Sequence, residues 1–121
     1  PVTFTKLVST GRISLERFAA ITSTNAAKIL GMYPQKGAIA VGSDADIVLF
    51  DPDLRKKLTL QDLHADSDYS IWEGFECRGY PVMTILRGKV IVEDGRLVGS
   101  TSDGRWLKRK VAPEVLARPV V

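Results

Sequence analysis

The first third of the chain has the apolar spacing and the end signals of helices. Ser14 is a good N-cap for a helix over residues 15–20, and residues 2–9 are expected to form a further helix or the end of one. A second short helix is predicted from Asn25 to Leu30, and Gly31 can take the left-handed position after its last turn. Four consecutive residues offer capping oxygens for that helix: Thr22, Ser23, Thr24 and Asn25.

After Pro34 the pattern becomes that of short strands. Two glycines, at 37 and 42, bracket a short extended stretch over residues 38–41. Residues 46–51 are a compact apolar run of β-forming residues, which Pro52 is expected to stop. A run of this kind predicts a strand buried on both faces, and residues 56–60 are expected to pair with it.

A β-hairpin is the clearest local signal in the second half. Residues 82–86 and 89–93 are strand-like and are separated only by Arg87 and Gly88, which favours a tight two-residue turn. The dipeptide Asp94-Gly95 is expected to turn the chain once more.

In the remaining stretches the hydrophobic positions recur with neither a helical nor a strand period. Residues 63–79 are expected to be loop with a turn of helix, and the chain from Ser100 onward is expected to be an extended arm. Helices followed by an antiparallel meander make the predicted fold class α+β.

Composition places the chain among single soluble domains. It has 121 residues, 45% hydrophobic content and a net charge of +3, and its apolar runs are too short to span a bilayer. A single cysteine, Cys77, allows no intrachain disulfide and favours a reducing, cytoplasmic location. The start at Pro1, without an initiator Met or a signal peptide, leads us to expect that an upstream segment is missing.

A basic cluster near the end of the chain is a candidate binding feature. No aromatic stacking platform or nucleic-acid motif accompanies it, so a solvated tail is the preferred interpretation, with neither nucleic acid nor membrane as a partner. Its members are Arg105, Lys108, Arg109 and Lys110.

A metal site is the first chemistry to consider around His64, the only histidine. Asp62, Asp66 and Asp68 lie nearby, but no second histidine or cysteine is close enough to complete a zinc ligand set. A polar loop with turn-capping aspartates is therefore preferred.

The carboxylates around the apolar strand and the single thiol do not predict a catalytic site either. Asp44 and Asp46 precede the apolar strand while Asp51 and Asp53 follow it, roughly 20 Å away at about 3.3 Å per strand residue, so the pairs cannot share a substrate atom. Turn and strand-end roles are expected for all four. Cys77 has no supporting histidine pattern, so a packed thiol is preferred over a nucleophile.

Long motifs carry a resemblance to a known family. Residues 21–31 and 37–48 closely resemble the C-terminal signature of the amidohydrolase superfamily. Residues 68–79 resemble a stretch of dihydropyrimidinases and hydantoinases, and residues 11–18 and 104–110 look like the same family. The chain is therefore identified as similar to the C-terminal part of a cyclic-amide hydrolase.

This resemblance implies a parent protein with a (β/α)₈ barrel and a small β-sandwich built from both chain ends. It places residues 1–33 among the last barrel helices, residues 34–99 in the sandwich with a connecting loop, and residues 100–121 in an extended C-terminal arm. The parent is expected to bind two divalent metal ions, zinc by family resemblance, and to open a cyclic amide. None of its catalytic, substrate-binding or metal-ligating residues has a counterpart in this chain, which is expected to be inactive scaffold.

Two further expectations concern partners. The remainder of the parent chain is the first expected partner, and a homo-oligomer is the second. Without the other sandwich strands, sheet edges and an apolar helix face are expected to be open. A non-catalytic, partner-binding parent similar to the collapsin response mediator proteins remains an alternative.

Overall fold

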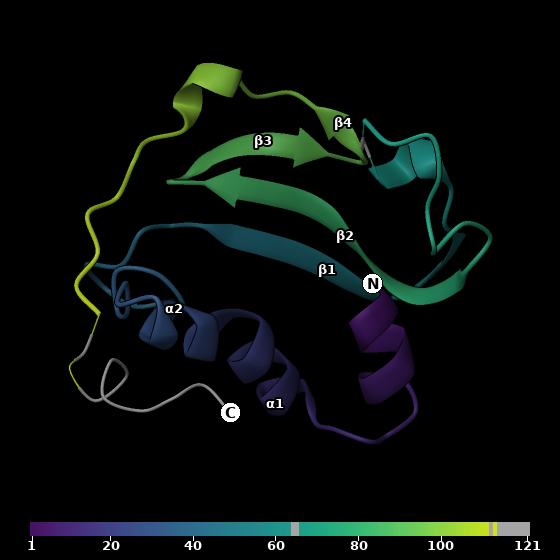
Figure 1. Ribbon diagram of the computed structural model, residues 1–121, viewed down its shortest axis with the longest axis horizontal. Helices are drawn as coiled ribbons and strands as arrows, with labels where there is room; N and C mark the ends of the chain where they lie inside the picture. Colours follow the sequence, from purple (N-terminus) through teal and green to yellow (C-terminus); the bar gives the residue numbers. More distant parts are fainter. Residues whose placement is uncertain (64–65, 112, 114–121) are drawn as a thin grey trace.

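A computed structural model describes residues 1–63, 66–111 and 113. A four-stranded antiparallel sheet, in the order β1-β2-β3-β4, has a helical layer lying along its β1 side (Figure 1). The predicted α+β class is confirmed. Within the described residues, no helix has the length and apolar character needed to cross a membrane.

One continuous run of helical turns extends from Leu15 to Ile29. It comprises α1 (Leu15–Ala19), the π-helical η2 (Ala20–Thr24) and α2 (Asn25–Ile29), and it follows a separate π-helical segment, η1 (Phe4–Val8). The predicted helices near residues 2–9, 15–20 and 25–30 are thus confirmed.

The ends of this helical run are as predicted, but its middle is not. The Ser14 hydroxyl accepts a hydrogen bond from the Arg17 amide at 3.2 Å, and Gly31 has φ +68°. The expectation that residues 22–25 cap a separate second helix is wrong, because Thr24 has helical dihedrals and caps nothing. The Thr22 hydroxyl instead donates to the carbonyl of Phe18 at 2.7 Å, so the hydroxyl is satisfied inside an unbroken helix.

The sheet confirms the predicted hairpin. Its strands are β1 (Ile47–Lys57), β2 (Glu76–Leu86), β3 (Lys89–Glu93) and β4 (Arg96–Leu97). Arg87 and Gly88, at φ +46° and +82°, form the two-residue turn between β2 and β3, as the right-handed twist of the strands favours. Asp94 and Gly95, at +47° and +75°, turn the chain into β4.

Strand β1 corrects the expectation that Pro52 ends it. The strand continues to Lys57, with a shift of register against β2 between Asp51 and Arg55. An Asp51 carboxylate oxygen accepts the amides of Asp53 and Leu54 at 2.9 and 3.1 Å, which stabilises the irregular turn of backbone. Proline is tolerated here because β1 is an edge strand. Residues 56–57 therefore belong to β1 and do not pair with it.

Burial corrects the second expectation about this strand. Val48 is 55% exposed and Leu49 is 45% exposed, so β1 is not buried on both faces within the described part of the chain. Residues 38–41 form no strand there, and Ile39 and Val41 are exposed. Strand β2 begins at Glu76, inside the stretch over residues 63–79 that was expected to be loop. The short 3-10 helix η3 (Leu60–Leu63) precedes that stretch and reaches it only at Leu63.

Three aromatic rings join the helical layer to the sheet. The ring of Phe4 lies 5.6 Å from that of Phe18 and 4.7 Å from that of Phe50, measured between centroids. Gly79 on β2 has φ +84°, and a Cβ added there would lie 2.5 Å from Phe4, so the missing side chain lets the rings approach the strand. Leu58, at 1% exposed, is the most completely buried large side chain in the described region.

Candidate functional site

Lys36 draws together the two aspartates that precede β1. Its Nζ lies 2.9 Å from Oδ2 of Asp44 and also donates to Oδ2 of Asp46. Gln35 donates a further hydrogen bond to Asp44 at 3.1 Å. The three charged side chains are between 17% and 30% exposed, so the cluster is largely shielded from water.

The shielding and the pairing set the proton affinities of this cluster. Burial alone would lower the pKa of Lys36, but its hydrogen bonds to Asp46 and Asp44 outweigh that effect and raise the pKa. The Lys36 hydrogen bond lowers the pKa of Asp44. Burial would raise the pKa of Asp46, but hydrogen bonds from Lys36 and from the Arg87 amide lower it overall. Both carboxylates are therefore ionised at neutral pH and poorly suited to accept a substrate proton.

The cluster continues across the hairpin turn into the C-terminal arm. Oδ1 of Asp46 accepts the backbone amide of Arg87 at 2.8 Å, and the Arg87 guanidinium donates to the backbone carbonyl of Asp103. Lys89 lies 3.2 Å from the Asp103 carboxylate, and Arg105 lies 4.0 Å from Asp44. We call this set of contacts the Lys36 network. Its members are Lys36, Asp44, Asp46, Arg87, Lys89, Asp103 and Arg105.

The arm is held at a second point. The Lys110 amide donates to the carbonyl of Gly31 at 3.3 Å, and a Cβ on Gly31 would overlap the Lys110 carbonyl group. The side chains of residues 108–110 are exposed, as predicted for a solvated tail, but the backbone beside them is docked on the end of α2. The Lys36 network and Gly31 together fasten the arm to the sheet and to the helices.

Asp44 and Asp46 have the predicted strand-end roles, whereas Asp51 and Asp53 lie within β1, which continues past them to Lys57. Asp44 and Asp46 belong to the Lys36 network, Asp51 caps its own turn, and Asp53 lies 3.2 Å from Arg78. The two pairs occupy opposite sides of the apolar run of β1 and serve different contacts.

The carboxylates near His64 do not form a metal site in the region the structure describes. His64 itself lies outside the described residues. Asp62 pairs with Lys56 at 2.6 Å and accepts the amide and hydroxyl of Thr59 at 3.0 and 2.8 Å. The Lys56 and Thr59 hydrogen bonds lower the pKa of Asp62. Across residues 1–63, 66–111 and 113, no group of three or more His, Cys, Asp or Glu side chains could hold a metal ion.

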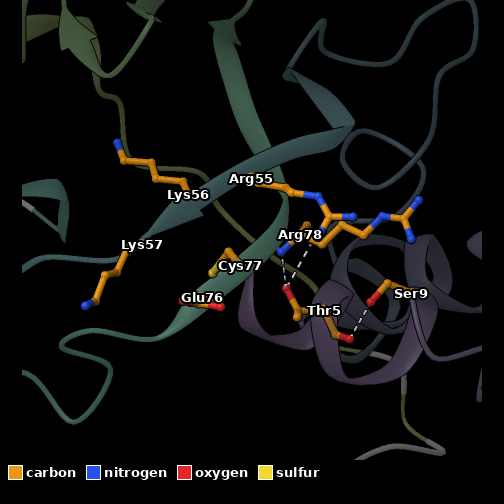
Figure 2. A pocket seen from close by; sticks show the side chains of 8 residues that line it. All are labelled: Thr5, Ser9, Arg55, Lys56, Lys57, Glu76, Cys77 and Arg78. Atoms are coloured by element: carbon orange, nitrogen blue, oxygen red, sulfur yellow. Dashed lines mark hydrogen bonds between the residues drawn. The ribbon is translucent and has the colours of Figure 1, made fainter.

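Cys77 is a packed thiol, as predicted. It is 3% exposed and lies on β2 at the wall of a shallow hollow between β1, β2 and η1 (Figure 2). The described residues include no histidine that could activate it as a nucleophile.

Comparisons with known proteins identify the family. A family model described as "Amidohydrolase family" matches residues 2–91. A D-hydantoinase of Ralstonia pickettii is 50% identical over 103 residues, 85% of this chain and 22% of that protein. A D-phenylhydantoinase of Escherichia coli O1:K1 is 47% identical over 114 residues, 93% of this chain and 25% of that protein.

Solved structures agree with these matches. The dihydropyrimidinase from Brevibacillus agri NCHU1002 superposes with a TM-score of 0.88 at 43% identity, over 98% of this chain and 25% of that chain. This chain thus spans about a quarter of the length of its relatives. With a family model matching most of its length, the chain belongs to the Amidohydrolase family.

Proposed function

We propose that this chain is the C-terminal scaffold segment of a metal-dependent hydrolase that opens the ring amide of hydantoins or dihydropyrimidines. The observation that carries the proposal is the 50% identity to a D-hydantoinase over 85% of the chain. The relatives named above all carry enzyme names, and none of these names supports a non-catalytic parent.

The chemistry of the described residues supports a scaffold role. The paired carboxylates of the Lys36 network fasten the loop before β1, the hairpin and the arm, and they leave no free acid–base pair in that network. The described residues also do not fit a metal centre. We therefore assign the metal ions and the reacting groups to the remaining three-quarters of the length seen in the relatives.

Exposed apolar surface supports the remainder of the parent as the first partner. The buried hydrophobic core of the described chain consists of Phe4, Ala27, Leu58 and Cys77, whereas many large apolar side chains are exposed. Some lie on the open edge strand β1 and others on the helical layer, where additional polypeptide would bury them. They include Val48, Leu49, Leu15 and Ile29. In this proposal residues 1–33 complete a barrel, residues 34–99 a sandwich, and residues 100–121 an arm within a cytoplasmic homo-oligomer.

Ring-opening assays on the longer protein test the proposed activity. Hydantoin, 5-phenylhydantoin and dihydrouracil are incubated with the purified protein, and the carbamoyl amino acid products are separated by chromatography. We expect turnover of at least one ring, lost on chelation and restored by a divalent metal. A metal-loaded protein that opens none of these rings would reject the proposal in favour of a non-catalytic parent.

A further inference from the structure

The β1–β2 ladder contains a like-charged pair of arginines. Arg55 on β1 lies directly opposite Arg78 on β2. Side chains directly opposite in an antiparallel pair have Cβ atoms about 4.5–5.5 Å apart, and like charges at that separation are destabilising. The next pair but one, Lys57 opposite Glu76, has complementary charges. Repulsion is therefore built into this ladder at the arginine pair.

Little counter-charge offsets this repulsion. Arg78 lies 3.2 Å from Asp53, whose side chain is 81% exposed, and such a solvated pair is worth little. Arg55 has no ion pair within the part of the chain that the structure describes. Among the described residues, the ion pairing of the two guanidinium groups is thus limited to the exposed carboxylate of Asp53 beside Arg78.

Both arginines line the hollow between the sheet and η1. It has a volume of about 460 Å³, and the two side chains extend in the same direction over the helix that carries Thr5 and Ser9 (Figure 2). The Thr5 hydroxyl donates to the Arg78 carbonyl at 3.0 Å and accepts the Arg78 amide at 3.1 Å. The backbone that carries one guanidinium is therefore tied to the helix beside the hollow.

Of the charged side chains that line the hollow, only the two arginines are available to bind a further group. Lys56 is engaged by Asp62 at 2.6 Å and lies over the ring of Tyr80 at 4.7 Å, so its ammonium is already occupied. Figure 2 shows Lys56 and Lys57 pointing away from the two guanidinium groups. Glu76 contributes the one carboxylate among the residues lining the hollow, and Lys57 is its cross-strand partner.

We propose that Arg55 and Arg78 form a binding site for an oxyanion, a phosphate or a carboxylate group. Guanidinium groups present forks of N–H donors that match the paired oxygens of these groups, and an anion between them converts repulsion into two attractive contacts. The site lies outside the Lys36 network and does not depend on the proposed ring-opening activity.

Calorimetric titration tests the site in the longest protein that carries this chain. Inorganic phosphate and acetate are titrated separately, at matched ionic strength in sodium chloride, into wild type, Arg55→Gln, Arg78→Gln and the control Arg12→Gln. Arg12 is an exposed arginine outside the hollow. Its substitution therefore removes the same charge from the protein without changing the hollow. We expect at least one anion to bind wild type and Arg12→Gln alike, and about tenfold more weakly to each of the other variants. A preference for phosphate or acetate identifies the group bound.

Equal affinity in all four proteins would overturn the proposal, as would binding of neither anion beyond the effect of sodium chloride.

Thermal unfolding adds a second measurement that does not need a tight complex. Without phosphate or acetate, Arg55→Gln should match or exceed the wild-type midpoint, because the substitution removes a repulsion. With the bound anion, wild type should become the more stable. An Arg55→Gln midpoint below wild type in sodium chloride alone would contradict the repulsion on which the site rests.

Discussion

Replacement of Gly79 by alanine tests the packing that holds the helical layer against the sheet. Gly79 has φ +84°, and an added Cβ would lie 2.5 Å from Cδ1 of Phe4 and 2.7 Å from Cε1 of Phe50. Left-handed backbone costs a non-glycine residue about 1–2 kcal/mol. An extra carbon in a packed site costs about 1–3 kcal/mol more, since the Phe4 ring is buried and has little room to shift. We expect Gly79→Ala to lower the local free energy of unfolding by about 2–5 kcal/mol.

Gly88→Ala is the matched control for this substitution. Gly88 has φ +82°, but an added Cβ would meet nothing within 4 Å, so only the backbone cost of about 1–2 kcal/mol applies. Native-state hydrogen exchange on peptides covering β1, β2 and the hairpin measures both effects locally. Equal losses in the two variants would refute the close packing of the phenylalanine rings over Gly79.

Three other substitutions probe separate contacts. Leu58→Ala should lower the free energy of unfolding by about 2–5 kcal/mol in urea denaturation, because Leu58 is 1% exposed, and a negligible loss would contradict its burial. Lys36→Met should remove stabilisation that depends on ionised Asp44 and Asp46. Because folding lowers the pKa of both carboxylates, wild type keeps this stabilisation above their ordinary value of 3.8 and loses it as the pH falls below. The protection factor for hydrogen exchange in the loop over residues 36–46, which corrects for the intrinsic effect of pH, should therefore fall at low pH in wild type and be small at every pH in the variant. Identical pH profiles of this protection factor would argue against the ion cluster. Gly31→Ala should displace the arm from α2 and speed its cleavage by trypsin, whereas unchanged cleavage would deny the contact.

Features encoded by a few neighbouring residues could be predicted from the sequence. The hairpin followed from Arg87 and Gly88, because a two-residue loop demands a narrow set of backbone angles. The start of α1 followed from Ser14, whose hydroxyl reaches an amide only three residues away. The strand-end roles of Asp44 and Asp46 likewise followed from their positions before an apolar run.

Features that depend on distant segments were missed or predicted wrongly. The continuation of β1 past Pro52 depends on its place at the sheet edge, which local sequence does not specify. The exposure of Val48 depends on which chains cover the sheet, so an apolar run alone could not settle its burial. Lys36 went unnoticed because its partners lie 8 and 10 residues further along, beyond a loop with no regular period.

The arginine pair also depends on distant segments. Arg55 and Arg78 are 23 residues apart, and only the register between β1 and β2 places them opposite each other. No local pattern in the sequence marks this register. The bulge after Asp51 sets it, and that bulge was itself unexpected.

Hydrolysis of 5-phenylhydantoin by the 121-residue chain alone is the most direct test of the scaffold assignment. The chain is assayed with added zinc beside an equal concentration of the longer protein. Because no group of potential ligands among the described residues could hold a metal, we predict turnover by the longer protein and none by the isolated chain. Turnover by the isolated chain at the rate of the longer protein would contradict the claim that catalysis resides elsewhere.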